Sequence, residues 1–432
     1  MKQKINMVTL GCSKNVVDSE YLMKQLDING WEVLIDSNDP TADVVIINTC
    51  GFIADAKEES IDTILRFVEA KRKGLISKVF VMGCLSQRYK AELQLEIPDV
   101  DGYFGVDQLA DILQSLNTSY SSAFANRRLI STPKHYAYLK ISEGCSWGCS
   151  FCAIPLIRGK HISKPIPELL DEAQWLAKEG VKELILIAQD STFYGKDIYG
   201  ERKLPELVGK LSAIDGINWI RIHYAYPSGF PLDLLKVMGE NPKVCKYLDI
   251  PFQHISDRML KAMRRGISKK QTVELIEMIR REIPEIAIRT TLLVGHPGET
   301  EQDFNELMDF VRTYRFDRLG VFTYSHEEGT HSATLIDDVP DDIKQRRAEL
   351  VMELQQEISL ENNQNRIGKV LEVIIDREEG GYLIGRTEFD SPEVDQEVFM
   401  SKPHGNKIFP ADIVKCQIKS AEDYDLMGDI IQ

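Results

Sequence analysis

Three short apolar segments near the start of the chain each end close to a cysteine. They are residues 5–10 before Cys12, residues 44–48 before Cys50, and residues 79–82 before Cys84. Helical patterns follow each segment, and strands that alternate with helices predict a parallel α/β sheet. Ligands of such sheets bind at the carboxyl ends of the strands. A lone cysteine is often just a small buried hydrophobe, but three repeats favour a shared site at one edge of the sheet.

The alternation of strand and helix patterns continues from about Tyr136. Six apolar runs are separated by amphipathic stretches such as residues 167–178 and 303–313. The runs are residues 137–141, 183–188, 219–224, 247–250, 286–294 and 319–322. This pattern predicts a partial (βα)6 barrel that is active at the carboxyl ends of its strands.

The last part of the chain changes in pattern. Residues 341–365 are charged and Gln-rich, and they predict a connecting helix. Four short strand patterns follow, separated by Gly, Pro and Asp, at residues 369–376, 381–386, 396–400 and 413–418. They predict a small β-barrel. With a prior of about 150 residues per domain, we expect three domains, at residues 1–120, 131–364 and 365–432.

Charge and cysteine content narrow the possible functions. The chain has 432 residues, eight cysteines and a net charge of −15, which does not favour general attraction to nucleic acid. No stretch approaches the roughly 18 apolar residues of a membrane span, so we expect a cytoplasmic protein with no membrane partner. Because that compartment keeps thiols reduced, the cysteines indicate metal ligation or redox chemistry rather than disulfides.

The strongest local motif is C-x3-C-x2-C, formed by Cys145, Cys149 and Cys152 just after the first strand of the second domain. Three thiolates leave one iron of a cubane cluster without a protein ligand, which is the open position that a cofactor needs. Structural zinc is the alternative, but it requires four ligands. His161 could supply the fourth, although a loop histidine is the simpler interpretation.

This motif, after the first strand of a partial barrel, resembles the radical S-adenosylmethionine superfamily. The resemblance implies a 4Fe-4S cluster, with S-adenosylmethionine chelated at its open iron. Reductive cleavage of the cofactor then gives a 5'-deoxyadenosyl radical, so the cofactor supplies the difficult chemistry. An electron donor such as flavodoxin or ferredoxin is then also expected.

Members of the superfamily hold the cofactor with groups at the ends of later strands. The matching positions in this sequence are Gln189, Gln253, Gly295, Pro297 and Gly298, and Arg158 is a further candidate for a carboxylate contact. Glycine permits close backbone approach, although a Gly-Pro turn is more often only a turn. No side chain is needed as a general base, so no catalytic residue is assigned.

With the upstream cysteines added, the chain resembles the radical S-adenosylmethionine methylthiotransferases. That family carries a second 4Fe-4S cluster, which here would be held by Cys12, Cys50 and Cys84. Its C-terminal β-barrel is a substrate-recognition module called TRAM, so the resemblance covers essentially the whole chain. Cys245 and Cys416 fall outside both sets, and we expect them to be packed residues.

Two subclasses compete within this family. One modifies the β-carbon of an aspartate in small-subunit ribosomal protein twelve, and the other modifies an adenosine of transfer RNA. Residues 366–432 contain eight Lys and Arg against 14 Asp and Glu, a net charge of −6. Such a module would repel phosphate and would suit a basic ribosomal protein, free or in the ribosomal subunit.

Local sequence also favours the ribosomal-protein subclass, through residues 11–20, 189–197 and 386–395. A non-enzymatic metal or electron-transfer protein is the alternative from another class. It is disfavoured because electron carriers rarely need a barrel and a recognition module of this size.

Overall fold

The N-terminal part of the chain forms a five-stranded parallel sheet in the order β2-β1-β3-β4-β5. The computed structural model describes residues 3–37, 42–402 and 408–431. The strands are β1 (Lys4–Thr9), β2 (Glu32–Ile35), β3 (Val44–Thr49), β4 (Lys78–Gly83) and β5 (Gly102–Tyr103). The helices are α1 (Ser13–Ile28), α2 (Ala54–Arg72), α3 (Cys84–Glu96) and α4 (Leu109–Ser115). The three expected strands are present, and β2 and β5 are additional.

Alternate side chains of the central strand β3 enter different cores. Ile46 packs with Leu22 of α1 on one face of the sheet, and Ile47 packs with Ile64 of α2 on the other. All six residues of β3 are buried. A strand that is covered on both faces reads as a continuous apolar run, which is why it was predictable from sequence.

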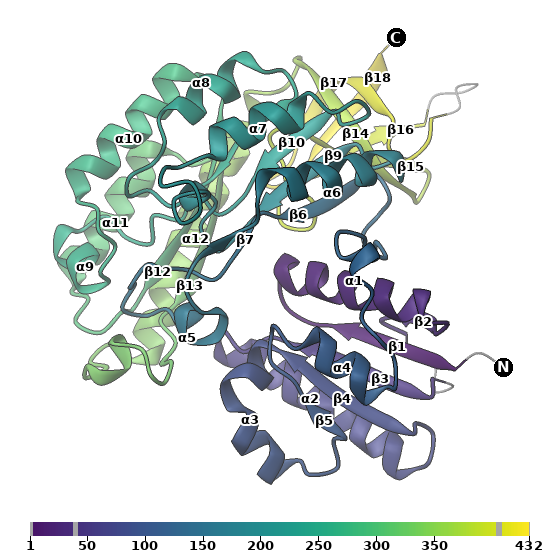
Figure 1. Ribbon diagram of the computed structural model, residues 1–432. Coiled ribbons are helices and arrows are strands. Elements are labelled where there is room, and N and C mark those ends of the chain that lie inside the picture. Colours follow the sequence, from purple (N-terminus) through teal and green to yellow (C-terminus); the bar gives the residue numbers. More distant parts are fainter. Residues whose placement is uncertain (1–2, 38–41, 403–407, 432) are drawn as a thin grey trace.

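The middle of the chain forms a six-stranded parallel sheet whose strands lie in chain order. They are β6 (Tyr136–Lys140), β9 (Glu183–Ile187), β10 (Trp219–Ile222), β11 (Val244–Asp249), β12 (Ala287–Val294) and β13 (Arg318–Thr323). The covering helices are α6 (Ile166–Lys178), α7 (Leu204–Ser212), α8 (Asp233–Glu240), α9 (Asp257–Ala262), α10 (Lys269–Glu282) and α11 (Glu301–Tyr314). Figure 1 shows these helices outside the curved sheet, as the partial (βα)6 barrel predicts.

A short insertion follows β6 at the carboxyl edge of this sheet. It contains β7 (Ser142–Glu143), β8 (Ile162–Ser163) and the five-residue helix α5 (Ile154–Arg158). Strands β7 and β8 pair antiparallel, with Ser142 opposite Ser163. The cysteine motif lies between β7 and α5, and Figure 1 shows α5 where the central barrel meets the N-terminal domain.

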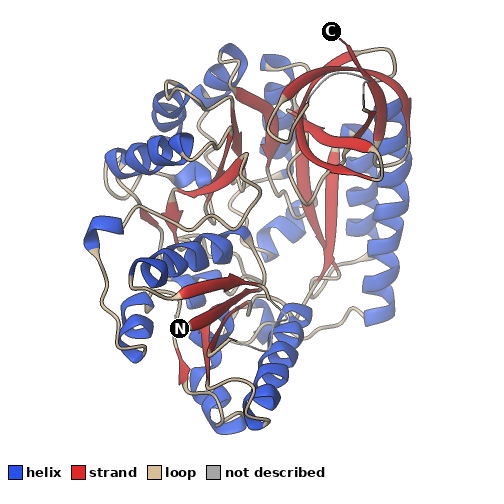
Figure 2. Cartoon of the chain, turned by 90° about the vertical axis from the view of Figure 1, so that its right-hand side faces the viewer, coloured by secondary structure: helices blue, strands red, loops and turns tan. Residues whose placement is uncertain are grey.

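The long helix α12 (Asp341–Gln364) leads to a closed five-stranded barrel, visible as a ring in Figure 2. Its strands are β14 (Val370–Glu379), β15 (Tyr382–Thr387), β16 (Val398–Ser401), β17 (Ile413–Ala421) and β18 (Leu426–Ile431), in the order β14-β15-β16-β18-β17. The predicted β-barrel is confirmed. Strand β18, which pairs with both β16 and β17, was not predicted.

The C-terminal barrel contacts the central sheet through buried charges. The Glu183 carboxylate accepts from Arg221 Nε at 2.7 Å and from Arg386 Nη2 at 2.9 Å. Asp390 pairs with Arg318, and Asp395 pairs with Arg289. Some of the acidic residues that were expected to attract a basic partner are therefore neutralised within the chain.

Membrane association through a spanning helix has no support in the described part of the chain. None of its helices is both long and apolar enough to cross a bilayer.

Candidate functional site

The loops that carry Cys12, Cys50 and Cys84 follow three adjacent strands, β1, β3 and β4. Cys12 immediately precedes α1, and Cys84 is the first residue of α3. Gly11 has a φ of +89°, and a Cβ atom there would lie 2.8 Å from Cys50 Cβ. The structure thus brings these loops together at one edge of the sheet. Their role as cluster ligands stays a prediction.

Burial changes the acidity of these thiols. It raises the pKa of Cys50 above its usual value and raises the pKa of Cys84 to about 11. A negative charge on the neighbouring Cys12 would raise the pKa of Cys50 and of Cys84 further. A neutral buried thiol becomes a good ligand only when a metal takes the place of its proton.

The second set of cysteines lies in the loop between β7 and α5. Cys149 Sγ is 3.3 Å from the Tyr226 hydroxyl and accepts from Arg265 Nη1 at 3.3 Å. Burial raises the pKa of Cys145 to about 11 and that of Cys152 to about 12. A buried arginine beside these sulfurs would stabilise the negative charge of ligating thiolates.

Aromatic rings cover this cysteine loop. Trp147 stacks on Tyr226 with ring centroids 4.2 Å apart, and its Nε1 donates to Asp190 Oδ2 at 2.6 Å. The rings cover the loop only in part, since Cys145, Cys149 and Cys152 stay half-buried, and partial exclusion of water tunes the potential of a cluster. Sequence reasoning missed Tyr226 and Arg265, because neither belongs to a motif with recognisable spacing.

His161 contacts Ser163 and Phe193 and not the cysteines. Its Nε2 lies 3.0 Å from Ser163 Oγ, and its ring packs edge-on against Phe193. Among the described residues, no three His, Cys, Asp or Glu side chains are arranged to hold a single metal ion. The structure therefore gives no support to a four-ligand zinc site that includes His161.

A closed ring of four alternating charges links the two cysteine regions. Arg158 Nη1 donates to Glu143 Oε1 at 2.9 Å and to Asp18 Oδ2 at 3.1 Å. Lys140 Nζ completes the ring through Glu143 Oε2 at 2.7 Å and Asp18 Oδ1. Burial alone would raise the pKa of Glu143, but Lys140 and Arg158 hold that pKa well below its usual value.

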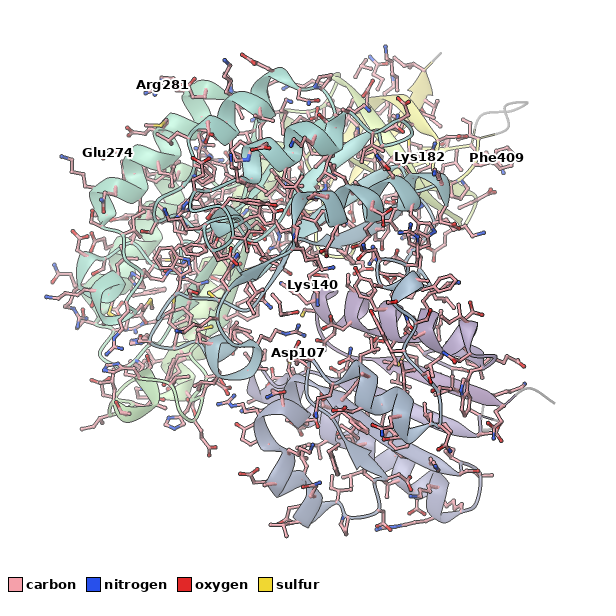
Figure 3. All side chains as sticks on the ribbon, viewed as in Figure 1. Asp107, Lys140, Lys182, Glu274, Arg281 and Phe409 are labelled. Atoms are coloured by element: carbon pink, nitrogen blue, oxygen red, sulfur yellow. The ribbon has the colours of Figure 1, made fainter. Side chains whose placement is uncertain are left out.

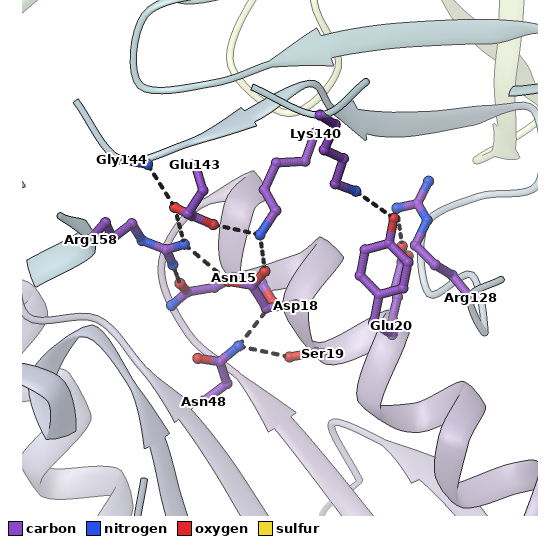
Figure 4. Close-up of polar contacts among 12 residues, drawn as sticks. Asn15, Asp18, Ser19, Glu20, Asn48, Arg128, Lys140, Glu143, Gly144 and Arg158 are labelled. Atoms are coloured by element: carbon purple, nitrogen blue, oxygen red, sulfur yellow. Dashed lines mark hydrogen bonds and ion pairs between the residues drawn. The ribbon is translucent and has the colours of Figure 1, made fainter. Parts of the chain in front are cut away.

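Asn15 contacts this ring through Arg158 (Figure 4) and also binds the N-terminal cysteine loops. Its Oδ1 accepts from Arg158 Nη2 at 2.6 Å, and its Nδ2 donates to the carbonyls of Leu10 and Thr49 at 2.8 and 3.1 Å. Cys84 Sγ is 3.8 Å from the same Oδ1. Figure 3 shows Lys140 at this junction, with Asp107 on the N-terminal side.

The residues expected to contact S-adenosylmethionine lie at the carboxyl edge of the central sheet. Gln189 Nε2 donates to Glu143 Oε1 at 3.0 Å, and its buried Oε1 has no partner among the described residues. Gln253 has a φ of +72° and bridges to Leu292. The cofactor contacts of both residues stay predictions.

The glycine segment after β12 is held by the chain itself. The Gly295 N–H donates to Glu299 Oε2 at 2.5 Å, and the Gly298 N–H donates to Asp338 Oδ1 at 2.6 Å. The Pro297 carbonyl lies 3.0 Å from His296 Nδ1. Both terminal nitrogens of Arg158 are engaged by Asn15, Asp18 and Glu143, and its contact with the cofactor carboxylate stays a prediction.

The donor set fits an iron-sulfur cluster. Each cysteine region offers three thiols, all eight cysteines are free, and no imidazole or carboxylate completes a four-ligand site in the described chain. Three thiolates are one short of the four that close a cubane, so one iron stays open to another ligand.

Models of known families match all three parts of the chain. The Radical SAM superfamily matches residues 139–311, Uncharacterized protein family UPF0004 matches residues 4–105, and the TRAM domain matches residues 367–431. Together with the cysteine motif at the carboxyl edge of the central sheet, these matches define a radical S-adenosylmethionine enzyme. Such an enzyme uses a 4Fe-4S cluster and S-adenosylmethionine.

Proteins of known name match this sequence along almost its whole length. The protein from Flavobacterium johnsoniae is 54% identical over 429 residues, covering 99% of this chain and 98% of the relative. The protein from Christiangramia forsetii is 55% identical, covering 99% of this chain and 94% of the relative. Both are named ribosomal protein uS12 methylthiotransferase RimO. The chain belongs to this RimO family of methylthiotransferases.

Solved structures share the fold at low identity. The radical S-adenosylmethionine methyltransferase TsrM from Kitasatospora setae, with cobalamin and a [4Fe-4S] cluster bound, has a TM-score of 0.57 at 13% identity. The match covers 89% of this chain and 77% of TsrM. A second TsrM structure, with tryptophan substrate and a cofactor analog, has a TM-score of 0.55 at 15% identity, covering 74% and 73%.

Proposed function

We propose that this protein transfers a methylthio group to the β-carbon of an aspartate in ribosomal protein uS12. The observation that carries the proposal is the presence of two sets of three cysteines, each at the carboxyl edge of a parallel sheet. The ring of Arg158, Glu143, Lys140 and Asp18 joins the two regions. Full-length similarity to relatives named for this activity supports the choice of substrate.

Cys145, Cys149 and Cys152 would hold the cluster that binds S-adenosylmethionine. Tyr226 and Arg265 contact Cys149 directly, and Trp147 covers the loop by stacking on Tyr226. Their role is to exclude water and to balance the negative charge of three thiolates. When bound, the cluster and S-adenosylmethionine supply a carbon-centred radical that can remove a hydrogen atom from an unactivated carbon.

Cys12, Cys50 and Cys84 would hold a second 4Fe-4S cluster, where the transferred sulfur is bound. Asn15 fixes the backbone before Cys12 and Cys50 through Leu10 and Thr49. Because the reacting atoms must be held close and aligned, this rigid support has a direct role in sulfur transfer.

The cofactor positions predicted from sequence remain part of the proposal. Gln189, with its unpaired oxygen, is the strongest of them, followed by Gln253 and the segment of Gly295, Pro297 and Gly298. The chain would divide into a cluster domain at residues 1–120, a radical domain at residues 131–364 and a recognition domain at residues 365–432. A cytoplasmic flavodoxin or ferredoxin would donate the electron.

The test is anaerobic reconstitution of the full chain with iron and sulfide, followed by incubation with reductant, S-adenosylmethionine and uS12. We expect about eight irons per chain, as two 4Fe-4S clusters require, and a methylthio mass gain on one aspartate. About four irons per chain with no mass gain on uS12 would indicate a radical enzyme with a single cluster. Eight irons with unmodified uS12 would redirect the search to transfer RNA.

A further inference from the structure

Arg158 is linked to the segments that carry five of the six cysteines, through its own helix α5 and through its partners Glu143 and Asn15. It is the last residue of α5, the helix that follows Cys152, and Ile157 of that helix packs against Cys84 in a small buried cluster. Glu143, its partner, accepts from the N–H of Gly144, the residue before Cys145, at 3.3 Å. Through Asn15 it also reaches the backbone that precedes Cys12 and Cys50.

Two elements supply the opposite sides of this contact. Asn15 and Asp18 are three residues apart on α1, so they lie on one face of that helix. Both accept from Arg158, which is only 5% exposed. Lys140 and Glu143 belong to the central barrel and complete the ring from the other side.

A guanidinium group suits this position better than an ammonium group. Arg158 uses Nη1 for the two carboxylates and Nη2 for the Asn15 amide, so its planar fork fixes the direction of three hydrogen bonds at once. A lysine would keep the charge but present one rotating point charge. The geometry of the fork therefore determines the spacing of α1 from α5.

We propose that Arg158 is a positioning residue that sets the separation of the two cysteine loops, so that hydrogen removal is coupled to sulfur transfer. This inference rests on the proposed function and adds a residue that controls its efficiency. It assigns Arg158 no contact with the reacting atoms. Its loss should uncouple the two steps, because a small displacement of reacting groups strongly slows their reaction.

The test compares Arg158→Lys with the wild-type holoenzyme. The measured quantity is the amount of 5'-deoxyadenosine formed per methylthiolated uS12. We expect this ratio to rise on the order of tenfold, while iron per chain stays at the wild-type value. Asp18→Asn keeps Arg158 in place but weakens its ion pair with α1. It should raise the ratio in the same direction, and it covers the case in which Arg158→Lys fails to fold.

Tyr21→Phe is the matched control. Tyr21 lies on the same helix α1, and its hydroxyl donates to Glu172 Oε2 of the barrel at 2.6 Å. The hydroxyl also accepts from Lys164 Nζ at 2.8 Å, so the substitution removes two hydrogen bonds between the same two domains. Neither bond involves a residue of the cysteine loops. It should leave the ratio of deoxyadenosine to product unchanged.

Hydrogen exchange of the iron-free protein gives a second readout that does not depend on activity. Residues 10–15 and 49–52 should exchange faster in Arg158→Lys than in the wild type or in Tyr21→Phe. Wild-type exchange and a wild-type ratio in Arg158→Lys would overturn the proposal, as would an equal change in Tyr21→Phe. Loss of half the iron would also overturn it, by making Arg158 necessary for cluster retention.

A wrong assignment of the proposed function would give a different result from a wrong role for Arg158. If the wild-type protein forms no methylthio product, the assigned substrate is wrong, whereas the exchange comparison still decides whether Arg158 holds the loops.

Discussion

Glu183 and Arg386, 203 positions apart in the sequence, form a fully buried ion pair with a separation of 2.9 Å. Glu183 is the first residue of β9, and Arg386 lies in β15 of the C-terminal barrel. The second carboxylate oxygen of Glu183 accepts from Arg221, and Arg386 also pairs with Asp376, so two anions balance two cations. The two barrels are therefore joined through charges that water does not reach.

Glu183→Gln should destabilise the protein by about 3–5 kcal/mol, because it leaves Arg221 buried without its counter-charge and leaves Arg386 with Asp376 alone. Urea unfolding of the iron-free protein measures the loss. Glu378→Gln is the control, because Glu378 pairs with Lys402 where both side chains are nearly half exposed. That change should cost less than about 1 kcal/mol, and an equal loss in both variants would contradict the importance of burial.

Gly144→Ala should prevent normal assembly of the cysteine loop between β7 and α5. Gly144 has a φ of +70°, and a Cβ atom there would lie 2.2 Å from the carbonyl oxygen of Lys160. The carbonyl is backbone and cannot move aside cheaply, and the left-handed conformation itself is costly for alanine. We expect iron per chain to fall by about half, to the content of one 4Fe-4S cluster.

Gly148→Ala provides the comparison within the same motif. A Cβ atom at Gly148 would meet no other atom within 4 Å. Iron content should therefore stay at the wild-type value. A similar loss in both variants would show that the loop tolerates no side chain at either position.

Cys152→Ala and Cys84→Ala should separate the two halves of the reaction. The first should abolish 5'-deoxyadenosine formation, because it removes a ligand of the cluster that binds S-adenosylmethionine. The second should leave deoxyadenosine formation intact but stop methylthio transfer. Liquid chromatography of deoxyadenosine, combined with mass spectrometry of uS12, measures both, and loss of cleavage in both variants would refute the division.

Cys416 should make the protein less stable in alkaline solution. Burial raises its pKa to about 11, well above the ordinary value of a thiol, with a smaller contribution from Asp429. A raised thiol pKa favours the folded state below about pH 9, and that advantage is lost as the pH rises toward 11. The loss should be about 1.4 kcal/mol per pH unit across this range.

Denaturation of the iron-free protein at pH 8, 9 and 10 checks this slope. Cys416→Ala should show a slope that is shallower by the contribution of one thiol, whatever its absolute stability. An unchanged slope would assign the alkaline loss to other groups, such as Cys245, whose pKa burial raises to about 12.

Strands that are buried along their whole length were predicted from sequence. Strand β3 and strand β9 are buried at every position, so their apolar runs are unbroken. In contrast, β2 has no fully buried residue and β5 has only two residues. Strand β18 alternates buried and exposed positions around Gly428 and Asp429, which breaks the apolar signal.

The cysteine spacing predicted which residues share a loop, but not what surrounds them. Arg158 meets Asn15 across 143 positions of sequence, and no local pattern encodes a contact of that separation. Net charge was similarly incomplete as a guide, because it does not tell which acids are already paired. Asp390 and Asp395 are paired with Arg318 and Arg289.

The order of strands in the central sheet has a consequence for how the protein forms during synthesis. Strands β6, β9, β10, β11, β12 and β13 occupy the sheet in the order in which they leave the ribosome. Each strand therefore finds its partner already synthesised, and the sheet can grow at one edge with short loop closures. The C-terminal barrel can bind Glu183 only after Arg386 has emerged. The buried Glu183 of β9, an early strand, therefore gains its ion pair with Arg386 only near the end of synthesis.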